Sequence, residues 1–475
     1  MLRNLSRYQI YLESKRQFYL SFFSIIIHSF TFQDSSWNPP VEIIGNFKND
    51  VAEFYFVIKD KLNLEKFLDI FVKNPSEIKK LEKFISKVHR VTIKKISHPN
   101  FKKLSNEQLG NLILYFYGQI EKFNYAAAII RAIDRQIYSR LKNIFKKKKD
   151  SDELIRLISV SNRLSLTLKE EIDILKLAMK IKDKSFSSKK VQKEIDKIYQ
   201  DHCWSTCSYY KEKPKTRYHY AKTLKSLIKK NPELLLKKIM DKITNELYER
   251  ERILDNLKKD EKIIAEITSS SAFLKDYARM FVNKLIFKSE PLFEEIARRT
   301  NKKIEYIKNL LPEEIKRLIN GLPNDKNLIK ERLKHNICLV HKGELFLLVG
   351  KEAKEFEKKY IEKDVKEMKE LKGRIACKGY GIGKAKIVLG VNDFKKFKKG
   401  DILVASNTSP DFVPIMKKAV AIVAEEGGIT THVSVISREL NIPCVVGIKD
   451  VTKIIKDNEM IEVDANKGVI KKVNS

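Results

Sequence analysis

The sequence predicts a multidomain protein with a largely α-helical N-terminal region and a C-terminal α/β domain. Two observations support this prediction. From about residue 75 to 335, apolar residues recur every three or four positions among polar ones, which is the pattern of amphipathic helices. Beyond Gly373 the pattern changes to short apolar runs typical of strands, alternating with short helical stretches. A chain of 475 residues is long enough for two or three domains.

The elements can be placed in order along the chain. Short strands are expected at Val41–Ile44 and Phe54–Ile58, and a hairpin at Ile337–Val340 and Glu344–Val349. A charged helix, Lys351–Leu371, is expected to serve as a connector. The periodicity predicts helices at Leu104–Phe116, Tyr125–Phe145, Leu166–Ile181, Leu234–Leu257 and Ile304–Leu322.

The C-terminal part divides into many short elements. Strands are expected at Arg374–Cys377, Lys384–Leu389, Asp401–Ala405, Val420–Ala424, Pro443–Val446, Met460–Val463 and Val469–Val473. Helices are expected at Val391–Phe397, Pro410–Lys418, His432–Leu440 and Val451–Ile455. The predicted division of the chain is a mixed α/β segment at 1–70, a helical domain at 71–335, the hairpin and linker helix at 336–371, and the α/β domain at 372–475.

Composition leaves two interpretations of the charge open. The formal net charge is +34, which suits a polyanionic partner such as RNA or a membrane surface. Lysine is spread along the whole chain beside Ile and Asn, however, and an AT-rich genome would also encode such a sequence.

The apolar run Phe18–Phe32 is too short and too polar for a membrane span, so a buried helix or strand is expected there. Five cysteines do not make a disulfide framework at this length, and a cytoplasmic location is expected.

The segment Glu425–Gly447 carries the most informative motif. A strand is expected to end at Ala424, and Gly427 and Gly428 permit a sharp turn with exposed backbone N–H groups. Thr430 or Thr431 can cap the helix that follows, which places His432 in its first turn. The positive end of the helix dipole disfavours an imidazolium there and stabilises an attached phosphate. His432 is therefore predicted to be a nucleophile for covalent phosphoryl transfer.

This segment resembles the phosphohistidine domain of the PEP-utilising enzymes, among them PEP synthase, pyruvate phosphate dikinase and rifampicin phosphotransferase. The resemblance covers about residues 372–475. Thr431, Val433 and Ser434 depart from the family pattern, but the changes are small and keep a hydroxyl beside the histidine. The positions that match are Leu403-Val404-Ala405, Thr408, Pro410-Asp411, Pro414-Ile415-Met416, Ala419, Gly427, Gly428, Thr430, His432, Arg438, Glu439, Ile442, Pro443 and Gly447.

The resemblance implies a β/β/α swivelling domain that carries a phosphoryl group on His432 between a donor site and an acceptor site. Gly427, Gly428, Thr430, Thr431 and Arg438 are the residues it implies around the phosphate. It also implies ATP or PEP as donor, with Mg²⁺. No glycine-rich nucleotide-binding segment is recognisable in the first 370 residues, and no PEP-binding barrel follows. The expected partner is therefore a separate ATP-grasp chain of the PEP/pyruvate-binding type.

The layout is similar to the rear portion of rifampicin phosphotransferase, so the helical domain is expected to bind or gate a small-molecule acceptor. The linker Lys351–Leu371 and the glycines Gly373, Gly379, Gly381 and Gly383 are expected to let the terminal domain pivot as a body. Two alternatives remain. One is a non-catalytic regulatory or interaction protein that keeps the domain, and the other is a basic RNA-binding protein, for which the sequence shows no recognisable motif.

Other residues that suggest chemistry have simpler explanations. His202, Cys203 and Cys207 invite a metal interpretation, but Trp204 beside them indicates packing, and no metal site is predicted. Glu425 and Glu426 suit either a role in tuning His432 or ordinary loop positions in solvent.

Overall fold

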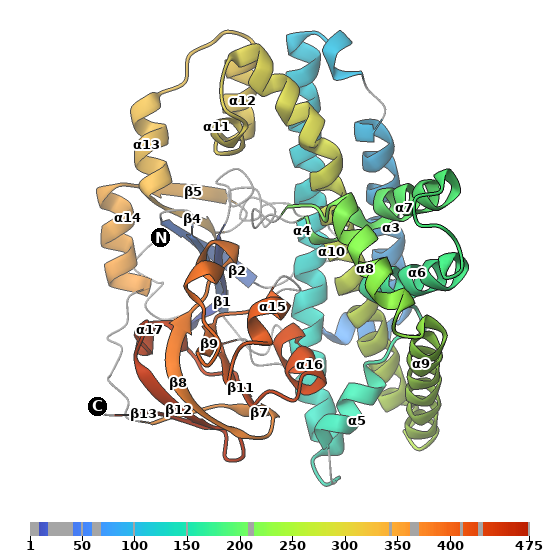
Figure 1. The fold of residues 1–475 in the computed structure, drawn as a ribbon. Helices are drawn as coiled ribbons and strands as arrows, with labels where there is room; N and C mark the ends of the chain where they lie inside the picture. Colours follow the sequence, from blue (N-terminus) through green and yellow to red (C-terminus); the bar gives the residue numbers. More distant parts are fainter. Residues whose placement is uncertain are drawn as a thin grey trace.

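The computed structural model describes residues 9–17, 41–48, 51–58, 68–97, 100–148, 151–207, 213–341, 344–361, 370–408, 412–425 and 431–473. Figure 1 shows a body of helices beside two separate sheets, with the C-terminal strands below the N-terminal ones. The predicted combination of an N-terminal helical region and a C-terminal mixed sheet is confirmed. The run Phe18–Phe32 lies outside the described residues.

Two long helices form the centre of the helical region, which we define as residues 76–334. α4 (Asn106–Phe145) packs along α10 (Lys259–Thr300), and α3 (Ser76–Ser97) packs against both. The sequence predicted two helices where α4 runs without a break, because buried Ile120 and Phe123 continue the apolar face between them. The side chains of Ile120 and Phe123 belong to one large core shared by α3, α4 and α10.

The predicted helix Ile304–Leu322 is in fact two short helices, α11 (Ile304–Lys308) and α12 (Pro312–Ile319). Pro312 explains the break, because proline lacks the amide hydrogen that a continuing helix needs and is well suited to the first helical position. The α12 helix then packs on α4, where Gly110 leaves room for the side chain of Lys316.

A second, smaller core joins α6 (Leu166–Ile181), α7 (Lys189–His202) and α8 (Arg217–Ile228). α5 (Ser151–Ile158), which precedes them, and α9 (Pro232–Asp255), which follows them, place buried residues in the large core instead. Cys203, Trp204 and Cys207 are buried in the smaller core beside Tyr220. His202 lies 3.0 Å from a carboxylate oxygen of Asp173, through its Nε2 atom. These contacts give the histidine and cysteines a packing role.

The strands on either side of the helical region pair in one sheet. β1 (Gln9–Gln17), β2 (Val41–Lys48), β3 (Val51–Ile58), β4 (His335–His341) and β5 (Glu344–Val349) are ordered β1-β3-β2-β4-β5, and all pairs are antiparallel. The predicted hairpin is β4–β5. Its pairing with β2 was not foreseen, and it makes the helical region an insertion between two parts of one sheet. α13 (Lys326–Lys334) leads directly into β4.

The connector differs from the single helix expected at Lys351–Leu371. α14 (Lys351–Phe356) continues into one turn of π-helix to Ile361, and residues 370–372 form a strand instead. Glu357 in the π-helical turn accepts hydrogen bonds from Asn46 (3.0 Å) and Lys48 (3.2 Å), both on β2. The start of the connector is therefore fixed to the five-stranded sheet.

The C-terminal domain, residues 370–473, contains an eight-stranded mixed sheet. The order is β6-β13-β12-β8-β9-β10-β11-β7, in which β8 to β11 run parallel and the outer pairs antiparallel. Most strands lie within one or two residues of their predicted positions, although β8 begins four residues earlier and β6 was not predicted as a strand. The eight strands of this sheet are β6 (Glu370–Lys372), β7 (Arg374–Cys377), β8 (Tyr380–Ile387), β9 (Ile402–Ala405), β10 (Ala421–Ala424), β11 (Cys444–Val446), β12 (Met460–Asp464) and β13 (Val469–Lys472).

Of the four glycines expected to form a hinge, Gly381 and Gly383 lie inside a strand of this sheet, whereas Gly373 and Gly379 lie between strands. A Cβ on Gly383 would stand 2.6 Å from the carbonyl oxygen of Gly400, and one on Gly381 would stand 2.8 Å from that of Val420. Both glycines belong to the part of β8 that pairs with β12, and residues 385–387 of the same strand pair with β9. Glycine is therefore required here for close backbone approach, and residues held in a β-ladder do not suit a hinge. The pivoting of the domain stays a prediction.

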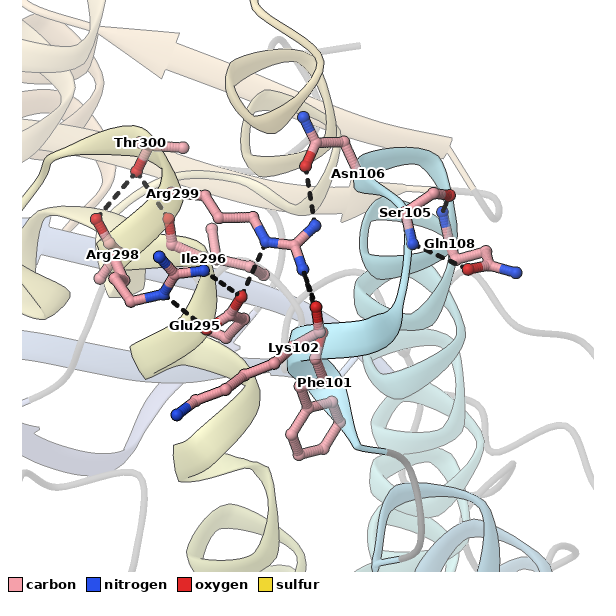
Figure 2. Close-up of polar contacts among 11 residues, drawn as sticks. Phe101, Lys102, Ser105, Asn106, Gln108, Glu295, Ile296, Arg298, Arg299 and Thr300 are labelled. Atoms are coloured by element: carbon pink, nitrogen blue, oxygen red, sulfur yellow. Dashed lines mark hydrogen bonds and ion pairs between the residues drawn. The ribbon is translucent and has the colours of Figure 1, made fainter.

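Figure 2 shows how the end of α10 is tied to the start of α4. Buried Glu295 accepts hydrogen bonds from Arg298 (2.7 and 2.9 Å) and from Arg299 (2.8 Å). Arg299 also donates to the Oδ1 atom of Asn106 and to the carbonyl of Phe101. The hydrogen bond from Arg298, together with Arg299, lowers the pKa of Glu295 to about 2.

Replacing Glu295 with Gln is expected to reduce the free energy of unfolding by about 2 kcal/mol at pH 7, the usual range for a hydrogen bond to a charged group. Because folding lowers the pKa of Glu295, its contribution is complete above about pH 4.3 and is lost as the pH falls toward 2. Chemical unfolding followed by circular dichroism measures the effect. Exposed Glu294 provides the matched control, and equal losses for Glu294→Gln and Glu295→Gln would contradict the prediction.

Candidate active site

The candidate site lies at one edge of the C-terminal sheet. β9 and β10 are parallel neighbours, so their carboxyl ends lie side by side. Thr408 follows β9, Glu425 follows β10, and His432 begins α16 (His432–Glu439) shortly after. Ligands of open α/β sheets bind outside the carboxyl ends of such strands. The predicted nucleophile is therefore at the edge of the sheet where a ligand is expected.

Thr408 orients the ring of His432. The Oγ1 atom of Thr408 lies 2.8 Å from the Nδ1 atom of His432, and the threonine side chain is buried while the histidine is half-buried. The threonine hydroxyl can either accept a hydrogen from Nδ1 or donate one to it. If Nε2 is the nucleophile it must carry the lone pair, and in that tautomer Nδ1 donates its hydrogen to Thr408.

Thr431, one of the two threonines predicted to cap the helix, occupies the N-cap position of α16. Its backbone is extended, with φ −70° and ψ 159°, and its carbonyl accepts the amide of Val435 at 3.0 Å. The Thr431 hydroxyl lies 3.1 Å from the hydroxyl of buried Ser434 instead of accepting a backbone N–H. Gly427, Gly428 and Thr430 lie outside the described residues, so their predicted contacts with a phosphate stay predictions.

Arg438 lies near the opposite end of α16 from His432. The two are six positions apart in the helix, which is about 9 Å along the axis. The Arg438 guanidinium donates to the carbonyl of Ala376 on β7, at 3.5 Å. In this arrangement the arginine ties α16 to the sheet edge, and its expected contact with a phosphate stays a prediction.

The sequence left the role of Glu425 undecided, and the structure gives this residue a contact with a neighbouring helix. Its Oε1 atom accepts hydrogen bonds from the backbone N–H (3.0 Å) and the hydroxyl (2.6 Å) of Thr452. Thr452 belongs to the first turn of α17 (Val451–Ile454), where a carboxylate is favourable. Glu425 therefore connects the end of β10 to α17. Glu426 lies outside the described residues.

Within the described ranges, no group of three His, Cys, Asp or Glu side chains is arranged to hold a metal ion. None of the helices in those ranges is long and apolar enough to cross a membrane.

Comparison with known protein families identifies the domain around this site. Residues 397–468 match the model of the PEP-utilising enzyme mobile domain. This stretch contains β9, β10, β11, β12 and α16, including Thr408 and His432. The match confirms the resemblance inferred from the motif, and it is confined to the mobile domain.

Curated relatives share the same part of the chain. A probable phosphoenolpyruvate synthase of Archaeoglobus fulgidus is 46% identical over 120 residues, which is 24% of this chain and 16% of that protein. Phosphoenolpyruvate synthase of Pyrococcus furiosus is 39% identical over 134 residues, 27% of this chain and 16% of that protein. The chain thus spans about a sixth of the length of the relatives it matches.

Among solved structures, a UPF0107 protein matches 22% of the chain at 15% identity with a TM-score of 0.19. Aconitase X of Thermococcus kodakaraensis matches 22% at 20% identity with a TM-score of 0.18. Scores this low support no argument about this chain.

Proposed function

We propose that this protein is a phosphotransferase component that carries a phosphoryl group on His432. The observation that supports the proposal most directly is the Thr408–His432 hydrogen bond within a stretch that matches the PEP-utilising mobile domain. The hydrogen bond orients the imidazole ring and suits the tautomer that a nucleophile needs, in which Nδ1 donates to the Thr408 hydroxyl. The relatives that share this stretch are phosphoenolpyruvate synthases, and their activity supports phosphoryl transfer as the reaction class.

In the proposed reaction, His432 Nε2 attacks the phosphorus atom of the donor, and the bond from phosphorus to the leaving oxygen breaks. Thr408 accepts the hydrogen of Nδ1 and stabilises the positive charge that the ring gains. The N-terminus of α16 favours the negative charge of the attached phosphate. Mg²⁺, bound with the donor, would neutralise phosphate charge during the transfer.

The donor, ATP or PEP, is proposed to bind outside these 475 residues, on an ATP-grasp chain of the PEP/pyruvate-binding type. A triphosphate cradle needs glycine-rich turns, yet the first 330 residues contain only Gly45, Gly110, Gly118 and Gly321, which are widely spaced. Gly110 and Gly118 lie within helix α4. The helical region is proposed to hold the acceptor.

The phosphorylated protein is expected to carry acid-labile, base-stable phosphate on His432. Phosphopeptide mapping at alkaline pH locates the label. His432→Ala should lose it completely, while Val435→Ala, on an exposed position of the same helix, should keep it. Label at another residue, or unchanged labelling of His432→Ala, would show that the proposed site is wrong.

A further inference from the structure

A cavity of about 470 Å³ opens between α6, α8 and α9 in the helical region. Its walls are mainly apolar, and the volume falls within the range of small-molecule sites, about 300–1,000 Å³. The apolar wall is made by Ile174, Leu175, Leu227, Leu235 and Ile239.

A buried polar cluster closes one wall of this cavity. Glu170 is 4% exposed, and each of its carboxylate oxygens lies 2.9 Å from the ammonium group of Lys215. The hydroxyl of buried Tyr220 donates to the same carboxylate at 2.7 Å. Because the carboxylate has several donors, its charge is satisfied within the protein. This cluster fixes α6 against α8 and keeps the cavity shape.

The charges on the lining cancel. Glu170 and Glu171 oppose Lys215 and Lys238, and His219 is the remaining titratable group. Burial, followed by the charge of Lys215, lowers the pKa of His219, so its ring is neutral at pH 7. An apolar lining without net charge favours an uncharged, mainly apolar ligand.

The cavity also lies near the helix that carries His432. Glu171 on its lining is close enough to Glu439 of α16 for the two charges to interact. Partial burial raises the pKa of Glu171, the charge of Glu439 raises it further and the charge of Lys242 opposes the rise, so the carboxylate is a stronger base than a fully solvated one. Glu439 and His432 are seven residues apart, so they lie on the same face of α16, about 10 Å along its axis.

We propose that this cavity binds the phosphoryl acceptor, and that the acceptor is an uncharged, mainly apolar alcohol or phenol. The transfer step rests on the proposed function, whereas the binding step does not. In the transfer, the hydroxyl oxygen forms a bond to phosphorus and the phosphorus–Nε2 bond breaks, returning its electron pair to His432. The hydroxyl proton passes to the Glu171 carboxylate. The products are a phosphate monoester and free His432.

Binding is tested with 2-naphthol on the unphosphorylated full chain, by isothermal titration calorimetry. Leu235→Trp fills the cavity and is expected to weaken binding at least about tenfold, which is 1.4 kcal/mol. Leu234→Trp is the matched control, because Leu234 is the preceding residue of α9, is 47% exposed and does not line the cavity. It should bind like the wild type. No binding by the wild type, or equal binding by the two tryptophan variants, would overturn the proposal.

Transfer is tested with chain phosphorylated by phosphoramidate, a small donor that needs no protein site, and then mixed with 2-naphthol. Formation of 2-naphthyl phosphate is expected for the wild type and Leu234→Trp and should fall at least about tenfold in Leu235→Trp. Glu171→Gln should bind 2-naphthol normally yet transfer slowly. If His432 takes no phosphate, the proposed function fails while the binding result stands. If His432 is phosphorylated but Leu235→Trp forms 2-naphthyl phosphate at the rate of the wild type, the acceptor site is elsewhere.

Discussion

The purified 475-residue chain, given ATP or PEP with Mg²⁺, is expected to gain no phosphate on His432. The few glycines before residue 330 are widely spaced, and Gly110 and Gly118 lie within helix α4, where they cannot form the turns of a phosphate cradle. Adding an ATP-grasp chain of the PEP/pyruvate-binding type should produce phosphohistidine. The measurement is incorporation of radiolabelled phosphate that survives alkali and is released by acid.

Phosphoramidate supplies the positive control for this experiment. It should phosphorylate His432 without a partner, which would show that the histidine itself is reactive. His432→Ala should stay unlabelled by the partner chain. If the isolated chain labels itself from ATP or PEP at a catalytic rate, the helical region contains a donor site and the assignment of the donor to another chain is wrong.

Replacing Thr408 with Val is expected to slow phosphorylation of His432 about tenfold, because one hydrogen bond worth about 1.4 kcal/mol is lost. Valine fills nearly the same volume at this buried position but cannot accept the Nδ1 hydrogen. The ring then loses the hydrogen-bond partner that orients it. The rate of labelling by phosphoramidate measures the effect and requires no partner chain.

Thr408→Ser is the matched control, because it keeps the hydroxyl and should react at nearly the rate of the wild type. The dependence of the rate on pH should also change in Thr408→Val, since the imidazole no longer has a fixed acceptor. A purely structural role would lower the rates of both variants without changing that dependence. Equal rates for Thr408→Val and the wild type would rule out the positioning role.

The C-terminal elements were predicted well because their sequence signals are local. Each parallel strand is a short run of fully buried apolar residues bounded by turn residues, as in Ile402–Ala405 and Ala421–Ala424. When short helical stretches lie between such runs, the runs indicate buried strands. The long helix α10 was missed because small polar residues such as Ser269 and Ser271 are buried among its apolar ones. Burial on several sides removes the apolar stripe on which periodicity depends.

The candidate site was predictable in part. His432 was found from residues adjacent to it, but its partner Thr408 is 24 positions away and is brought close only by the pairing of β9 with β10. The sequence marked Thr408 as a family position without indicating its contact. The acceptor cavity could not be foreseen either, because Glu170 and Lys215 are 45 residues apart and meet only when α6 packs near α8.

The pairing of β2 with β4 affects how the chain is made. In the finished sheet, Lys48 lies opposite His335, 287 positions later. At typical rates of about 5–20 residues per second, the ribosome needs roughly 15–60 s to synthesise the intervening helices. During that time one edge of β2 has no strand to pair with, and an open edge invites association with other nascent chains. Rapid folding of the helical insertion would add little to this interval, because it would place β4 beside the waiting edge as soon as β4 leaves the ribosome.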